Sequence, residues 1–97
     1  MREPKIYKSE AQMCRDALQL QDGCNLSGIA VTLWDMTCTL NRQGKGGAAV
    51  RRHPAVWMTV AKLADMVGIG ASSFDLWNEK EDEAKAIIAA AGMEVPA

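Results

Sequence analysis

The sequence predicts an all-α fold, a single small bundle of four helices at about 9–22, 25–41, 54–67 and 73–91. Three observations predict it. Apolar residues recur at three- and four-residue steps in four separate segments, residues typical of helix starts and ends flank those segments, and no segment alternates as a strand does. Because 48% of the 97 residues are apolar, the chain can build one core, and we expect one domain over 1–97.

The first helix is expected to begin after a loose or extended N-terminal arm, residues 1–8. Ser9 to Gln12 matches a capping box, in which the Ser9 hydroxyl accepts the backbone N–H of Gln12. One face of this segment is apolar and carries Ala11, Cys14, Ala17 and Leu18. Asp22-Gly23 is predicted to end or bend the helix.

The second helix has the clearest periodicity in the chain. Its apolar stripe is formed by Leu26, Ile29, Ala30, Leu33, Met36 or Thr37, and Leu40. Asn25 or Ser27 could supply the N-cap. The stripe predicts a central helix, so Leu33→Ala should lower the free energy of unfolding by about 2–5 kcal/mol.

A glycine-rich basic loop, 41–49, is expected to separate the second helix from the third. His53-Pro54 then restarts helical structure, because a proline at the first helical position lacks the N–H that would have no partner there. The apolar face of the third helix comprises Val56, Trp57, Val60, Ala61, Leu63, Ala64 and Val67. Gly68 is predicted to end it.

The fourth helix is expected to start at an N-cap supplied by Ser72 or Ser73. Asp75 falls in its first turn, where a negative charge is favoured. Its shared apolar face contains Phe74, Trp77, Ala84, Ile87, Ile88 and Ala91. Gly92 closes the helix.

Composition points to a cytoplasm and away from nucleic acids and membranes. A formal net charge of −1 lacks the basic excess of a dedicated nucleic-acid binder. The three cysteines cannot all pair and no signal-like start precedes them, so we expect reduced thiols. The longest uncharged stretch before the loop, 23–34, is too short to cross a bilayer.

The sequence offers no set of residues for catalysis or metal binding. The single histidine, His53, is expected to be occupied in starting a helix. Cys14, Cys24 and Cys38 lack the close pairs of a zinc site, and residues 44–47 lack the flanking residues of a phosphate-binding loop. We therefore expect no enzyme activity, no metal and no cofactor.

The basic residues gather in a stretch that has no acid, between Asp35 and Asp65. They are Arg42, Lys45, Arg51, Arg52 and Lys62. The first four are predicted to bind an acidic protein surface or a phosphate backbone. The alternative is that they are solvated charges, or that they attract the acidic run at 79–83, which could itself be a duplex-mimicking surface.

Residues 59–77 also have the spacing of a helix-turn-helix. If the second helix of this unit read bases, it would do so with Ser72, Ser73, Asp75 and Asn78, followed by acids. Carboxylates repel phosphates, so a plain corner of the bundle is the better interpretation. A DNA-binding transcriptional regulator is kept as the alternative function.

Two further motifs carry a resemblance. The run from Gln21 to Gly28, Gln-Asp-Gly-Cys-Asn-Leu-Ser-Gly, and the later His53-Pro54 helix start with Lys62 and Leu63, resemble a group of small phage and mobile-element proteins. Some proteins of this size and helical kind are anti-CRISPR inhibitors, which bind a CRISPR surveillance complex stoichiometrically. The resemblance covers about residues 10–68.

The resemblance implies a mobile-element setting, and in it Asp22, Asn25 and His53 fix the helix junctions. We expect a non-enzymatic inhibitor, in its sharpest form one that binds a type I CRISPR surveillance complex, with Asn25 and the basic loop at the contact. The chain would act as a monomer or homodimer, without direct nucleic-acid binding. A small-molecule or toxin-neutralising module is a third hypothesis.

Overall fold

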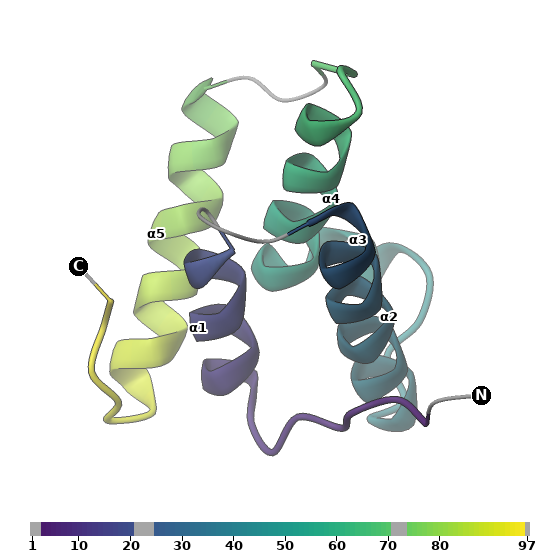
Figure 1. Cartoon of the computed structure of the whole chain (residues 1–97). Helices are drawn as coiled ribbons and strands as arrows, with labels where there is room; N and C mark the ends of the chain where they lie inside the picture. The colour runs from purple at the N-terminus through teal and green to yellow at the C-terminus, as the bar shows by residue number, and fades with distance from the viewer. Residues whose placement is uncertain (1–2, 21–24, 71–73, 97) are drawn as a thin grey trace.

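The computed structural model describes residues 3–20, 25–70 and 74–96, and these form a bundle of helices (Figure 1). The predicted all-α fold class is confirmed, although the described residues form five helices where four were expected. They are α1 (Glu10–Gln19), α2 (Leu26–Arg42), α3 (Ala48–Arg52), α4 (Pro54–Met66) and α5 (Phe74–Ala90).

The additional helix, α3, corrects the predicted loop at 41–49. One helical turn forms at its end, so Arg51 and Arg52 are helical residues just before α4. The sequence hid this helix because five residues are too few to show a periodicity. Buried Val50 holds it on the bundle, as tertiary packing commonly does for helices too short to be stable alone.

The helix α4 lies at the centre and contacts each of the other four helices. In Figure 1, α1 and α5 pack beside each other on one side of it, and α2 lies on the other. Within the described residues, no helix combines the length and apolar character that crossing a membrane requires.

Two helix starts follow the predicted caps. The Ser9 hydroxyl accepts the Gln12 N–H at 3.2 Å, and the Asn25 side-chain oxygen accepts the Gly28 N–H at 2.7 Å. Asn25 is thus the cap of α2, which decides between it and Ser27. The residues predicted to end α1 and to cap α5, at 21–23 and 72–73, lie outside the described residues.

Two helix ends are closed by the predicted glycines. Gly68 and Gly92 have φ of +82° and +74°, a left-handed conformation that costs a glycine little. Beyond Gly92, the Met93 N–H donates to the Ile88 carbonyl at 3.2 Å. This hydrogen bond pairs a carbonyl at the end of α5 that has no partner within the helix.

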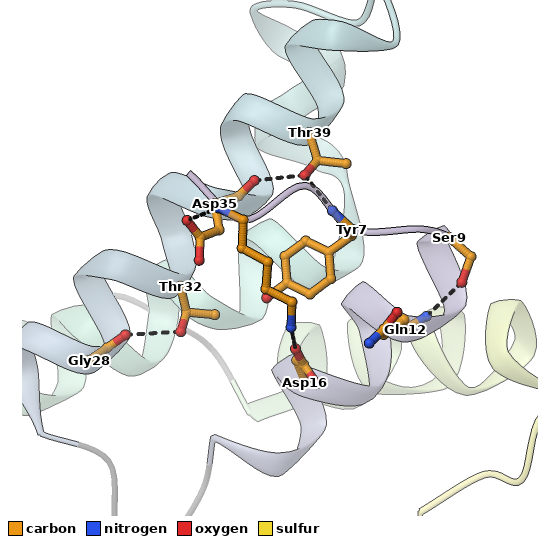
Figure 2. A network of polar contacts seen from close by, with 9 residues as sticks. Tyr7, Ser9, Gln12, Asp16, Gly28, Thr32, Asp35 and Thr39 are labelled. Atoms are coloured by element: carbon orange, nitrogen blue, oxygen red, sulfur yellow. Dashed lines mark hydrogen bonds and ion pairs between the residues drawn. The ribbon is translucent and has the colours of Figure 1, made fainter. Parts of the chain in front are cut away.

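The described part of the N-terminal arm, residues 3–8, is extended, which is one of the two expected forms. The Lys5 N–H donates to Asp35 Oδ1 at 3.0 Å, and the Tyr7 N–H donates to Thr39 Oγ1 at 3.1 Å (Figure 2). Alternate N–H groups of an extended chain are about 7 Å apart, and positions four apart on a helix rise about 6 Å. This match fastens the arm along α2, with Tyr7 buried.

The core corrects the predicted stripe of α2. Ile29, Met36 and Leu40 are fully buried, but Leu33 is only partly buried and Leu26 is 46% exposed. The arm explains the difference, because it covers the flank of α2 that carries Asp35 and Thr39. The buried side of α2 is therefore rotated toward the arm, and the opposite flank is left in solvent.

Candidate functional site: the His53 corner and the cationic edge

The basic residues between α2 and α4 fall into two groups. Lys45 joins Glu10 of α1 and His53 at the start of α4, a set that we call the His53 corner. Arg42 at the end of α2 and Arg51 and Arg52 of α3 form a second group, the cationic edge.

His53 starts α4 as the sequence predicts. Its backbone is extended, with φ −60° and ψ 129°, and its Nδ1 accepts the Ala55 N–H at 3.2 Å. Pro54 is the first residue of the helix. Because Nδ1 accepts a hydrogen bond, the neutral ring carries its proton on Nε2.

The other ring nitrogen of His53 points toward α1. Nε2 lies 3.7 Å from Glu10 Oε2 and is buried, without a hydrogen-bond partner among the described residues. Burial lowers the pKa of His53, and the negative charge of Glu10 partly offsets that effect. The ring therefore stays neutral and keeps its Nδ1 lone pair for the helix start.

Lys45, one of the four predicted contact residues, is already paired within the molecule. Its Nζ lies 2.6 Å from Glu10 Oε1, and this hydrogen bond lowers the pKa of the Glu10 carboxyl. The predicted alternative of an internal attraction therefore applies to Lys45. The acid that it meets lies on α1, whereas the predicted attraction was to the acidic run of α5.

The cationic edge differs from Lys45. Arg42, Arg51 and Arg52 are exposed, and no ion pair holds them within the part of the chain that the structure describes. Each lies in the last turn of its helix, where a cation is favourable to the helix dipole. The backbone at Arg52 is held by α5, since the Arg52 carbonyl accepts a hydrogen bond from Lys80 Nζ at 3.2 Å.

The remaining predicted site residues are Asn25 and Asp22. Asn25 is exposed, but its side-chain oxygen is used to cap α2. Asp22 lies outside the described residues.

The acidic helix α5 exposes carboxylates along its length. Asp75, Glu79 and Asp82 are exposed. The Glu81–Lys85 and Glu83–Lys80 pairs, at 3.4 Å each, neutralise part of this charge. If α5 were the DNA-recognition helix of the alternative helix-turn-helix, its first turns would place carboxylates against the DNA phosphates. Residues 71–73 of that unit lie outside the described residues.

The thiols that the structure describes are structural in character. Cys14 is fully buried, and burial raises its pKa to about 12. Cys38 is half-buried, and neither thiol is in a disulfide; Cys24 lies outside the described residues. In residues 3–20, 25–70 and 74–96, no group of three or more potential metal ligands is close enough to hold an ion.

Sequence reasoning missed an apolar surface on the outer side of α2. Val31 is 39% and Trp34 42% exposed there. Trp57 and Trp77 do pack together, with ring centroids 6.1 Å apart. A signal was available, since Asp35 is the only charged residue between 26 and 41.

Comparisons with known proteins add no relative to this geometry. No family model matches the chain, and neither a curated protein nor a solved structure matches it significantly. The arrangement of the cationic edge and the His53 corner is therefore the basis on which a function can be argued.

Proposed function

We propose that this protein is a non-enzymatic binding protein that docks on an acidic surface of a partner protein complex through the cationic edge. The observation that carries the proposal is the exposure of Arg42, Arg51 and Arg52 without an ion pair inside the described part of the chain. In its sharpest form, the protein is a phage or mobile-element inhibitor of a type I CRISPR surveillance complex. That target class rests on the resemblance in sequence.

The chemistry of the edge suits carboxylates. A guanidinium offers five N–H donors in a plane and forms paired hydrogen bonds with a carboxylate. Because these three groups have no ion-pair partner among the described residues, binding breaks no ion pair there, whereas Lys45 would first have to leave Glu10. Exposed charges of this kind speed association and select partners of opposite potential.

The edge is also held in place before any partner arrives. Val50 anchors α3 in the core, and the His53 N–H donates to the Val50 carbonyl at 3.2 Å. With Lys80 on the Arg52 carbonyl, the backbone that carries Arg51 and Arg52 is fixed on both sides. A surface ordered in advance loses less entropy on binding.

The test is charge reversal at the edge. Arg51→Glu and Arg52→Glu, made singly and together, should weaken binding to a purified type I surveillance complex by about tenfold or more in surface plasmon resonance. Lys8→Glu is the matched control, because exposed Lys8 undergoes the same charge change on the N-terminal arm. Unchanged affinity of the double variant, with its helical circular dichroism intact, would remove the edge from the function.

A second candidate keeps the same residues and changes the partner. Guanidinium groups also fit phosphate oxygens, so the helix-turn-helix regulator remains the alternative. A gel-shift titration with a duplex DNA fragment separates the two: binding that weakens steeply with salt supports the regulator, and no shift supports the protein binder.

A further inference from the structure

The outer face of α2 has the properties of an interface. Its exposed apolar residues are Leu26 at 46%, Val31 at 39% and Trp34 at 42%, with exposed Ser27 and Ala30 between them. We define these five residues as the α2 face. Positions three and four apart lie on one side of a helix, so the five share a continuous strip.

This strip carries no charge, and the structure shows why. The only charged residue between 26 and 41, Asp35, is buried on another side of α2, where it accepts the Lys5 N–H. By contrast, α5 exposes Asp75, Glu79 and Asp82. An exposed helix normally presents polar and charged residues to water, so a long uncharged strip with a tryptophan marks a surface that becomes covered.

We propose that a second copy of this chain covers the α2 face, so that the protein forms a two-fold symmetric dimer through antiparallel α2 helices. Shape favours this occupant. Trp34 and Ala30 are one turn apart, one large and one small, and both are exposed. A two-fold axis passing between them seats Trp34 of each copy on Ala30 of the partner subunit.

Charge favours the same occupant. Two copies of one surface oppose like charges at a two-fold axis unless the surface is uncharged, and the α2 face meets that condition. The net charge of −1 adds little repulsion between whole molecules. In the antiparallel arrangement the axis passes near position 32, so the two Arg42 side chains lie at opposite ends, about 30 Å apart along the helices, which is beyond the range of strong repulsion in physiological salt.

The size of the strip sets the expected strength. Its five residues span eight helical steps of α2, so the strip is about 12 Å long and one helix, about 10 Å, wide. This is far less than the roughly 800 Å² per partner of a standard interface. The dimer is therefore weak and forms only at high micromolar concentrations. Tryptophan near the centre of a small interface is the usual dominant contact.

Sedimentation equilibrium over a concentration series, with reductant present because Cys38 is on the same helix, tests the proposal. Wild-type protein should show a monomer–dimer equilibrium, and Trp34→Glu should raise the dissociation constant about thirtyfold or more. Ile69→Glu is the control, since Ile69 is 61% exposed beyond α4 and should leave dimerisation unchanged.

A charge-complementation experiment tests the arrangement itself. Ala30→Lys and Trp34→Glu should each be monomeric alone, and mixing the two variants should restore a heterodimer, because position 30 of one copy meets position 34 of the partner subunit. Wild-type protein that stays monomeric up to about 0.5 mM, or a Trp34→Glu variant that dimerises as wild type does, would overturn the proposal. Failure of the mixture to associate would overturn the antiparallel pairing. None of these measurements involves the partner of the cationic edge, so they are independent of the proposed function.

Discussion

The His53 corner and the cationic edge lie next to each other in the chain and have opposite surroundings. Lys45 and His53 face Glu10 and have partners or burial inside the molecule, whereas Arg51 and Arg52 end α3 in solvent. Within one basic stretch, Lys45 and His53 thus stabilise the fold, whereas Arg51 and Arg52 remain available to a partner. What divides them is the position of α1, which brings one carboxylate to the corner and none to the edge.

The largest expected effect concerns the core beneath the corner. Met58 of α4 is 1% exposed, so Met58→Ala should lower the free energy of unfolding by about 2–5 kcal/mol through lost burial and a residual cavity. Val60→Ala, on the same helix at 46% exposure, is the control and should change it by less than about 0.5 kcal/mol. Urea denaturation measures both. Equal effects of the two variants would show that α4 is not the central helix.

The helix start at His53 should have a smaller effect. His53→Ala removes the acceptor for the Ala55 N–H and should cost about 1 kcal/mol. His53→Asn restores a capping oxygen and should recover part of that loss. The urea denaturation midpoints of the two variants measure this difference in stability. An alanine variant as stable as the asparagine variant would mean that the cap contributes nothing.

The corner should also make stability depend on pH. The folded pKa of His53 lies below its ordinary value of 6.5, so the unfolded chain takes up a proton that the folded chain resists. Stability is then complete above about pH 6.5 and falls as the pH drops below it. Glu10, whose folded pKa lies below 4.5, adds a second loss as the pH falls through the range below that value.

Thermal midpoints between about pH 8 and pH 2 measure these two steps. His53→Asn should remove the first step and leave the second. A wild-type midpoint that stays constant from pH 8 to pH 5.5 would contradict the buried, neutral imidazole.

The smallest expected effects on the free energy of unfolding come from removing the charges of the corner and of the edge. Lys45→Ala breaks the pair with Glu10, but both side chains are more than a third exposed, so it should cost about 0.2–1 kcal/mol, and less in high salt. Arg51→Ala and Arg52→Ala should each change stability by less than about 0.5 kcal/mol. Guanidinium denaturation cannot resolve such salt-dependent values, so urea is used. A loss at Arg51 or Arg52 as large as that at Lys45 would erase the distinction between corner and edge.

Local chemistry in the sequence determined the helical class and the helix ends. Ser9, Asn25 and His53 cap helices because their side chains bond backbone N–H groups two or three residues away, and Gly68 and Gly92 end helices because they adopt positive φ. These interactions span a few residues, so a short segment of sequence contains both partners. The same reasoning found the basic stretch as a group.

Contacts between distant residues were decided only by the tertiary structure. The pairing of Lys45 with Glu10, 35 positions away, separates the corner from the edge, and no local pattern encodes it. The arm that bonds Asp35 and Thr39 likewise rotates α2, burying two polar residues and exposing Leu26. Periodicity shows that a helix has an apolar side, but the direction in which that side faces depends on what packs against it.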